Sequence, residues 1–492
     1  MGVRERGVVA AAGVAGLLAF LLAGGALTDD AYITLAYAKN LALHLHWGLI
    51  PQETANTATS PLTVAVLATA SEITRIGHGI HPVRALGVLV VVAWMAAGWG
   101  WTRVVRALEV PWIAAAIGVA VTLADPFLLS AVGLEVVFVP ALLVVLLAVA
   151  LEGRAVAFGV VAGAMLLTRL DLLVFVIVLG VGSPGIRAAW RRVLVVAGAL
   201  ALPWFAASWL LLGSAIPDTL VIKVEQTGRF GSLDYLTGPI DYLNGVPWLV
   251  SWAFAPALLG LAGLAARLAP GRDRDRDRRL APVVALGVAG VVYYGAYCVL
   301  SVPPYHWYYV TPIAALSTAA VVLSADWMRA ATRGPRRSAV GAAPLAVLAV
   351  LAVVTAATDV AHGVPWRSPP IFGNAAIARD YARVGIALRP LVGDGTVEAP
   401  GEIGTLAYFC GCAILDEFSD RGRVVERVNR DLEHGPGFTR VALRLNYLWL
   451  DRDERPRRPR LKLVYSRGPG PGWRVWSPAY GRGHIELRRA GT

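Results

Sequence analysis

Long apolar segments separated by short charged loops constrain this chain more than any other feature. The first of them, Val8 to Leu27, runs for about 20 residues without a charge. A helix of that length crosses the hydrocarbon core of a bilayer, and the segment is too long for the apolar part of a cleaved signal peptide. Further spans are expected at 83–102, 111–124, 134–151, 155–168, 171–183, 193–212, 247–267, 281–302, 307–326 and 340–358.

The composition agrees with a polytopic membrane protein and excludes an ordinary soluble globule. Hydrophobic residues make up 57% of the chain, charged residues 16%, and the mean hydropathy is +0.59. The net charge of +12 could suggest a nucleic-acid partner. Most of the basic residues, however, lie in short loops between apolar segments, where they orient helices in a membrane. We therefore expect no nucleic-acid partner.

The basic residues also predict the orientation. Arginines concentrate in one alternating set of loops, which includes the N-terminus and the run "GRDRDRDRR" (271–279). The loops richer in Lys and Arg face the cytoplasm, so the N-terminus is expected there. Eleven spans then place the C-terminal residues outside. The sequence predicts a multi-pass plasma-membrane protein whose C-terminal domain is external, or periplasmic.

One apolar stretch, Pro61 to Ile76, is not counted as a span, because a span there would invert every later loop. We expect it to lie in the interface, within a long first external loop at 28–82 built from short amphipathic helices. Lys39, His44, His46 and Trp47 in this loop suit a headgroup layer.

Two domains are expected. Residues 1–358 form the transmembrane domain, and residues 359–492, which carry many charges and prolines, form an external soluble domain. Within it, residues 395–420 read as strand, turn, short helix and strand, which is typical of a small α/β unit. Its C-x-C pair, Cys410 and Cys412, is too close in sequence for an unstrained bridge.

Ionisable and aromatic residues gather at the external ends of the predicted spans, where burial of charge is costly and points to a site. A simple structural explanation exists for each cluster alone, such as a helix end, a local ion pair or an interfacial anchor. Together they predict a cavity that opens outward and presents carboxylates and cations at the depth of the membrane surface. The clusters are Asp29 with Asp30, Asp125 with Glu135, Arg169 with Asp171, Lys223, and Tyr305 with His306.

This arrangement suits group transfer from a lipid-linked donor. A polyprenyl-phosphate sugar keeps its tail in the bilayer and its phosphate at the interface, where Arg169 or Lys223 could bind it. A carboxylate beside the sugar can deprotonate an acceptor hydroxyl or form a glycosyl-enzyme adduct. Adjacent aspartates allow a division of roles, in which one faces the substrate and the other holds the loop or a metal ion.

Several segments, in their order, resemble the GT-C superfamily of polyprenyl-phosphate-dependent glycosyltransferases, and within it the actinobacterial terminal arabinofuranosyltransferases. Over residues 29–420 they are "DDAYITLAYAKNLA", "TATSPLTVAVLA", "LSAVGLEVVF", "LLTRLDLL", "IPDTLVIK", "YHWYYVTP" and "GEIGTLAYFCGCAILDEF". The chain departs from that branch at Leu35-Ala36, where the branch has an aromatic residue and arginine, at Thr63 in place of tryptophan, and at Leu170 in place of proline. The departures leave the sugar and the acceptor open.

The resemblance implies a fold, an activity and roles for the residues. It implies transfer of a monosaccharide, by analogy arabinofuranose, from a polyprenyl-phosphate donor to a cell-envelope glycan such as arabinan, in cell-wall biogenesis. Asp30 is favoured over Asp29 as the catalytic carboxylate. Glu135 and Asp125 would help to bind the acceptor or a cation, and Arg169, Lys223 and His306 the donor phosphate, with Asp171 and Tyr305 in the same substrate site. A divalent cation, Mg²⁺ or Mn²⁺, would be held by Asp29 and Asp30 if the reaction uses one.

Three other functions remain open from sequence. A protein or lipid glycosyltransferase of mannosyl type would share the fold and the acidic motif. A polyprenyl-lipid or sugar transporter would also be polytopic, but it would tend to show repeated halves and charges near the midplane. The sequence shows no such repeat. A membrane-anchored scaffold that binds glycan without chemistry would not need ionisable groups clustered at one membrane face.

Overall fold

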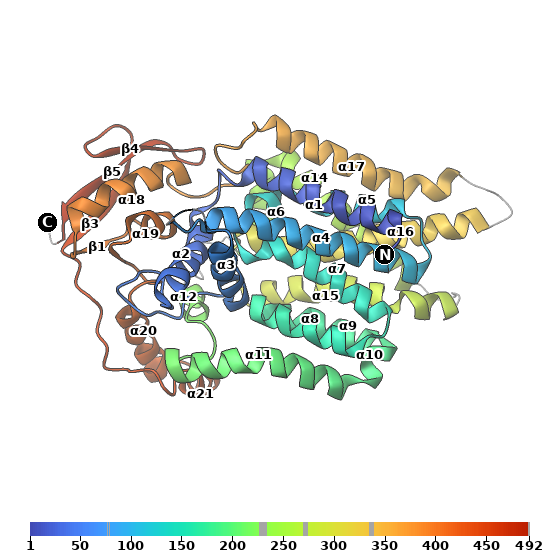
Figure 1. Cartoon of the computed structure of the whole chain (residues 1–492), viewed down its shortest axis with the longest axis horizontal. Coiled ribbons are helices and arrows are strands. Elements are labelled where there is room, and N and C mark those ends of the chain that lie inside the picture. The colour runs from blue at the N-terminus through green and yellow to red at the C-terminus, as the bar shows by residue number, and fades with distance from the viewer. Residues whose placement is uncertain (76, 78, 226–233, 269–273, 334–338, 491–492) are drawn as a thin grey trace.

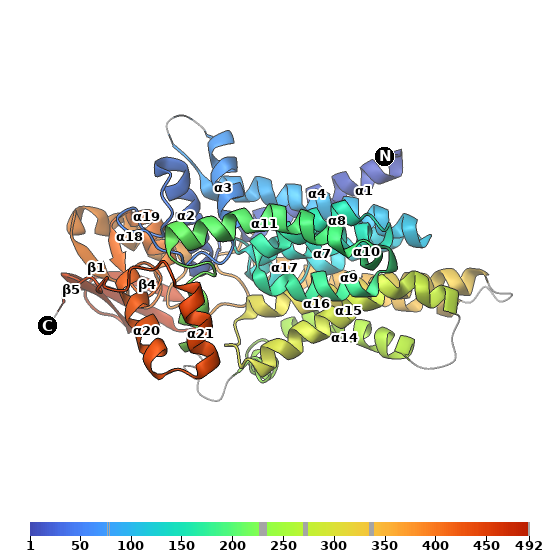
Figure 2. The ribbon, with the colours of Figure 1, turned by 90° about the horizontal axis from the view of Figure 1, so that it is seen from below.

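The computed structural model describes residues 1–75, 77, 79–225, 234–268, 274–333 and 339–490. Residues 271–273 of the arginine-rich run therefore lie outside the described residues. The molecule is elongated, with a helical bundle over most of its length and a sheet-containing domain at one end (Figures 1 and 2). The N-terminus lies at the end of the bundle away from that domain, and the last strand of the described residues lies within the domain (Figure 1).

A bundle helix coincides with each of the eleven predicted spans. They are α1 (Val3–Ala23), α4 (Pro82–Leu108), α5 (Ile113–Leu123), α7 (Val139–Leu151), α8 (Ala155–Thr168), α9 (Leu173–Gly182), α11 (Trp190–Leu212), α14 (Pro247–Leu268), α15 (Arg274–Val299), α16 (His306–Arg333) and α17 (Ala343–Ala361). Within the described residues, seven are long and apolar enough to cross a membrane, namely α1, α4, α11, α14, α15, α16 and α17. Since α5, α7, α8 and α9 are shorter, the total number of spans stays a prediction.

Shorter helices join the bundle helices at both ends of the bundle. They are α2 (Asp29–His44), α3 (Pro61–Ile73), α6 (Pro126–Ser130), η1 (Glu135–Phe138), η2 (Leu170–Leu172), α10 (Pro184–Ala188), α12 (Thr219–Glu225), α13 (Gly238–Gly245) and η3 (Ala339–Ala342). Helices α2 and α3 form within the predicted first external loop. Lys39 of α2 donates to the Tyr408 carbonyl at 2.7 Å, and the Trp47 ring packs on Trp204 at 4.5 Å. Lys39 thus contacts the C-terminal domain, and Trp47 contacts α11.

The C-terminal domain surrounds one five-stranded sheet. Its elements are α18 (Ala378–Val392), β1 (Thr396–Glu398), α19 (Gly404–Cys410), β2 (Ala413–Leu415), α20 (Arg421–His434), α21 (Gly437–Asn446), β3 (Leu461–Arg467), β4 (Trp473–Ser477) and β5 (Gly481–Arg489). The strand order is β2-β1-β3-β5-β4, with β1 parallel to β2 and β3 and the remaining pairs antiparallel. The predicted strand, turn, helix and strand over 395–420 are present as β1, α19 and β2.

The C-x-C pair differs from the sequence expectation, because Cys410 and Cys412 form a disulfide. Gly411 between them has a φ of +64°, a left-handed conformation that favours glycine. The turn brings the two Cα atoms to 5.1 Å, within the usual range for a disulfide.

Candidate active site

Asp29 connects the transmembrane bundle to the C-terminal domain. Its two carboxylate oxygens accept the backbone N–H groups of Gly404 at 2.7 Å and Thr405 at 2.8 Å, at the first turn of α19. A carboxylate is favoured there because the N-terminal N–H groups of a helix have no partner within it. A Cβ at Gly404 would lie 2.1 Å from the Asp29 carbonyl oxygen, so only glycine permits this approach. Asp29 thus holds two helices together.

Asp30, the next residue, is placed differently. It is partly exposed, whereas Asp29 is buried. Within the part of the chain that the structure describes, no hydrogen bond or ion pair engages the Asp30 carboxylate. The two adjacent carboxylates therefore differ in the structure: that of Asp29 binds backbone N–H groups of α19, whereas that of Asp30 is partly exposed.

Glu402 is a further acid beside this pair that the sequence argument did not single out. Its carboxylate accepts the backbone N–H of Ala375 at 2.9 Å and the hydroxyl of Tyr381. Burial, followed by the charge of Glu402, raises the pKa of Asp29 to about 7, and burial also raises the pKa of Glu402. In the sequence, Glu402 stands in the turn "GEIG" (401–404), which is too short a pattern to predict a site residue by itself.

The loop between α5 and η1 carries Asp125 and faces α16. Asp125 caps α6 by accepting the backbone N–H groups of Phe127 at 2.8 Å and Leu128 at 3.1 Å. His306, the first residue of α16, lies with Nε2 at 3.3 Å from the Ser130 carbonyl oxygen. These contacts fix the loop that leads to Glu135. In this structure Asp125 and His306 contact protein backbone groups.

Arg169 forms the centre of a compact polar cluster. Its guanidinium donates to Glu135 at 2.6 Å and to Asp171 at 2.6 Å, although these residues come from different helix ends. Two tyrosine hydroxyls, those of Tyr293 at 2.7 Å and Tyr297, donate to Asp171. Since two carboxylates face one guanidinium, the charge of Arg169 is already matched within the protein. The structure therefore brings together three of the predicted residues as an ion-pair network.

Lys223 is separated from the Arg169 cluster by a group of aromatic rings. Its ammonium nitrogen is 4.2 Å from the centre of the Tyr305 ring and 5.6 Å from that of Phe418 in the C-terminal domain. Tyr305 in turn contacts Tyr308, with ring centres 5.9 Å apart, and the Arg169 guanidinium lies 5.3 Å from the Tyr308 ring. A continuous row of contacts thus joins Lys223 to the Arg169 cluster.

Asp29 and Asp30 lie near the Arg169 cluster, because the residue that follows them packs against the loop that carries Glu135. Ala31 follows Asp30 and packs against Gly133, where an added Cβ would come within 2.6 Å of the Ala31 Cβ. Gly133 has a φ of +105°, and Glu135 follows two residues later. The structure therefore places α2, the Glu135 loop and the Arg169 cluster against one another at the end of the bundle nearest the C-terminal domain.

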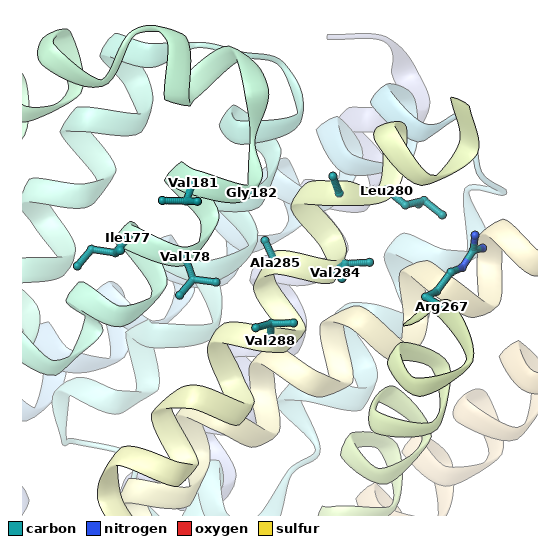
Figure 3. A pocket seen from close by; sticks show the side chains of 10 residues that line it. Ile177, Val178, Val181, Gly182, Arg267, Leu280, Val284, Ala285 and Val288 are labelled. Carbon is teal, nitrogen blue, oxygen red and sulfur yellow. The ribbon is translucent and has the colours of Figure 1, made fainter. Parts of the chain in front are cut away.

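An apolar cavity of about 650 Å³ lies elsewhere in the bundle. Side chains of α9, such as Ile177 and Val181, and of α15, such as Val284 and Val288, line it, and Arg267 lies at its edge (Figure 3). Arg267 donates to Asp326 at 2.8 Å. None of the predicted site residues lines this cavity. It occupies the opposite ends of α9 and α15 from Asp171 and Tyr297, so it is separate from the site.

A metal centre formed by protein side chains alone is not found in the described residues. No three or more His, Cys, Asp or Glu side chains within 1–75, 77, 79–225, 234–268, 274–333 and 339–490 are grouped to hold a cation. Both Asp29 oxygens already accept backbone N–H groups. Asp30 could supply one ligand, and Mg²⁺ sites often use one or two carboxylates together with substrate phosphates.

Comparisons with known proteins identify the fold. No family model and no curated protein matches the sequence. ArnT from Cupriavidus metallidurans, solved bound to undecaprenyl phosphate, matches 98% of this chain and 98% of its own at 14% identity and a TM-score of 0.55. The Archaeoglobus fulgidus oligosaccharyltransferase matches 94% of this chain and 69% of its own, at 13% identity and a TM-score of 0.58.

The mycobacterial arabinofuranosyltransferase AftD is also similar, at 14% identity and a TM-score of 0.51. The match covers 99% of this chain and 42% of AftD. All three structures have the GT-C membrane fold. The fold class predicted from the sequence motifs is therefore confirmed, as a helical GT-C membrane fold with a small C-terminal sheet.

Proposed function

We propose that this protein is a membrane glycosyltransferase that moves a monosaccharide from a polyprenyl-phosphate donor to a cell-envelope glycan on the outer face of the membrane. The sugar that the sequence resemblance favours is arabinofuranose. The GT-C fold supports the class of reaction, since the similar structures include complexes with undecaprenyl phosphate and dolichol phosphate. The sugar and the acceptor rest on the sequence motifs and on the likeness to AftD.

The observation that carries the proposal is the difference between Asp29 and Asp30. Asp29 is held by the backbone of α19, whereas Asp30 is partly exposed and engaged by no described residue. A general base must be able to approach the hydroxyl that it deprotonates. Asp30 is therefore the catalytic carboxylate in this proposal, and Asp29 is a positioning residue that fixes the first turn of α2.

In this proposal the donor phosphate binds at Lys223, at the boundary between the bundle and the C-terminal domain. Arg169 already faces the carboxylates of Glu135 and Asp171, so a phosphate there would compete with two anions. The Lys223 ammonium lies against the Tyr305 ring between the bundle and the C-terminal domain. Lys223 binds the phosphate, while Tyr305 and His306 shape the wall beside it. Glu135, Asp171 and Asp125 position the loops that carry the site.

The transfer proceeds by displacement at the anomeric carbon. The Asp30 carboxylate takes the proton of the acceptor hydroxyl as the hydroxyl oxygen forms its bond to the anomeric carbon. The bond between that carbon and the donor phosphate oxygen breaks, and its electron pair leaves with polyprenyl phosphate. Lys223 stabilises the added negative charge on the leaving phosphate. A Mg²⁺ or Mn²⁺ ion, if the reaction uses one, would be held by Asp30 and would supply further neutralisation of that charge.

The test is transfer by purified protein supplied with a panel of polyprenyl-phosphate sugars and envelope glycans. We expect Asp30→Asn to lower the rate by about 10²- to 10⁴-fold, the usual size of a general-base contribution. Asp29→Asn should retain a larger part of the activity. Full activity in Asp30→Asn would contradict the assignment of the base. Absence of transfer with every donor, together with passage of the lipid between leaflets in vesicles, would favour a transporter.

A further inference from the structure

A second cavity lies in the C-terminal domain, apart from the apolar one. It measures about 900 Å³ and is bounded by α18, by the β4–β5 hairpin and by the segment that precedes α18. Arginines line it on the side of α18 and on the side of the β4–β5 hairpin. The charged residues that line it are Arg367, Arg379, Asp380, Arg383, Arg474 and Arg482, and Trp476 is the aromatic residue among the lining side chains.

The charge of this arginine pocket is strongly unbalanced. Five guanidiniums surround one carboxylate, which leaves a net charge of +4 on the lining residues. Asp380 is already in use, since it accepts Arg383 at 2.7 Å and the backbone N–H of Trp476 at 2.8 Å. Within the part of the chain that the structure describes, Arg379, Arg474 and Arg482 have no carboxylate partner.

Part of the pocket is held in place by the fold. The Arg383 guanidinium also donates to the Arg474 carbonyl at 3.0 Å, so α18 and β4 are joined across the cavity. The Arg367 guanidinium lies 4.5 Å from the Trp476 ring, in a cation–π contact. Like charges gathered in a concave site repel one another and raise the local concentration of anions. An anionic ligand would remove that repulsion.

A short row of hydrogen bonds joins the pocket to Asp29, the proposed positioning residue. Ser477, which follows Trp476, donates to the Asn374 carbonyl at 2.6 Å. The Asn374 side chain accepts the backbone N–H of Asp29 at 3.2 Å. Near the other wall, the backbone N–H of Trp366 donates to the Leu22 carbonyl at 2.8 Å, which places Arg367 beside the end of α1. The pocket thus lies beside the start of α2.

We propose that the arginine pocket binds an anionic saccharide, and specifically a stretch of the acceptor glycan that carries carboxylate or phosphate groups. Guanidinium groups bind both kinds of anion in a bidentate manner, and the Trp476 ring offers a flat apolar surface beside them. A cavity of about 900 Å³ lies in the usual range for ligand sites, and it accommodates more than one sugar unit. This inference rests on the proposed function, which supplies the acceptor glycan, and the row from Ser477 to Asp29 places the pocket near the start of α2.

Binding can be measured without turnover, which separates this proposal from the proposed function. Purified full-length protein, without donor, is titrated with hexagalacturonate, a carboxylated oligosaccharide, and with maltohexaose, its neutral counterpart. We expect hexagalacturonate to bind, maltohexaose to bind at least tenfold more weakly, and added salt to weaken the first complex. Equal binding of the two oligosaccharides would overturn the proposal.

Variants locate the site. The double variant Arg379→Gln with Arg482→Gln should weaken hexagalacturonate binding at least tenfold at an unchanged melting temperature, because both side chains are exposed. The matched control, Arg440→Gln with Arg444→Gln on α21, removes the same charge elsewhere and should bind as the wild type does. Equal loss in both double variants would overturn the site, since it would indicate a response to net charge alone.

A third comparison separates a glycan from a lipid headgroup. Protein in nanodiscs of phosphatidylcholine should bind hexagalacturonate as tightly as protein in detergent. Nanodiscs with phosphatidylglycerol should not compete. Competition by phosphatidylglycerol that disappears in the Arg379/Arg482 variant would assign the pocket to lipid and overturn the proposal. If the wild-type protein transfers no sugar from any donor of the panel but still binds hexagalacturonate, the proposed function is refuted. The arginine pocket would remain an anion-binding site.

Discussion

The carboxylate of Asp29 accepts the backbone N–H of Gly404 at 2.7 Å, although 375 positions separate the two residues along the chain. The bond joins the first turn of α2 to the first turn of α19, and Thr405 adds a second one at 2.8 Å. Because Asp30 is the next residue, this attachment sets the direction in which its side chain leaves the helix. The aspartate pair is therefore one device in which the first residue positions the second.

Asp29→Ala should destabilise the protein, whereas Asp30→Ala should not. Removal of the Asp29 carboxylate leaves two buried backbone N–H groups without a partner, at a cost of about 1–3 kcal/mol each. Asp30 is partly exposed and makes no such bond, so its loss should change the free energy of unfolding by less than about 0.5 kcal/mol. Thermal unfolding of the purified variants measures both. Equal losses of stability would contradict the division of roles.

Asp29→Asn should change how stability depends on pH. Burial and the charge of Glu402 raise the pKa of Asp29 to about 7 in the folded protein, against about 3.8 in the unfolded chain. The folded state then holds the extra proton between these values, so this contribution is complete below about pH 4 and is lost as pH rises to 7. Stability of the wild type should fall relative to Asp29→Asn by up to about 1.4 kcal/mol per pH unit in that window.

The measurement is thermal or denaturant unfolding of both proteins at several pH values from 4 to 8. Since other buried carboxyls titrate in the same range, the difference between the two proteins is the informative quantity. Asp453→Asn, which changes an exposed carboxylate, serves as the control and should give a constant difference. A constant difference for Asp29→Asn as well would disprove the raised pKa.

The sequence predicted the helices well because hydropathy and length alone determine where a membrane helix can form. It also placed the acidic pair, the Arg169 turn and the small α/β unit. It favoured Asp30 over Asp29 but could not show what distinguishes their environments, since the difference depends on Gly404, a residue 375 positions from Asp29. Glu402 and the arginine pocket were missed for the same reason. Contacts between distant segments have no local periodicity to reveal them.

The Arg169 cluster also contains a contact between distant segments that the sequence did not predict. The sequence suggested a free cation for the donor phosphate, whereas the fold brings Glu135 to 2.6 Å from Arg169 in addition to its sequence neighbour Asp171. The ion pair between Arg169 and Asp171 could be predicted, because the two residues are only two positions apart. The Glu135 pair requires η1 and η2 to meet, which depends on the packing of α7 and α8.

Arg169→Met should be among the most destabilising substitutions at the site. It leaves the buried carboxylate of Glu135 and the half-buried one of Asp171 without their cation, which costs about 3–5 kcal/mol. Adding Glu135→Met to this variant should restore part of the loss, because one unpaired charge is then removed. A double-mutant cycle of unfolding free energies measures the coupling. Strict additivity would show that the two side chains do not interact in the membrane protein.

Gly133→Ala should lower transfer activity more than it lowers donor binding. The residue has a φ of +105°, which costs any other amino acid about 1–3 kcal/mol, and its new Cβ would lie 2.6 Å from that of Ala31. The clash moves the first turn of α2, and Asp30 with it, relative to the Glu135 loop. The kcat for transfer should fall by at least tenfold with KM for the donor little changed. Gly373→Ala is the control, since a Cβ there meets nothing within 4 Å.

Tyr305 variants test whether the ring beside Lys223 holds the cation for the donor. Tyr305→Phe keeps the ring and should preserve KM for the polyprenyl-phosphate donor within about twofold. Tyr305→Leu removes the 4.2 Å contact with the ammonium, which is worth about 0.5–1 kcal/mol, and should raise that KM by about two- to fivefold. The KM for the acceptor should not change in either variant, because Lys223 faces the leaving phosphate. An equal rise in both Michaelis constants would indicate that Tyr305 supports the fold and not the donor site.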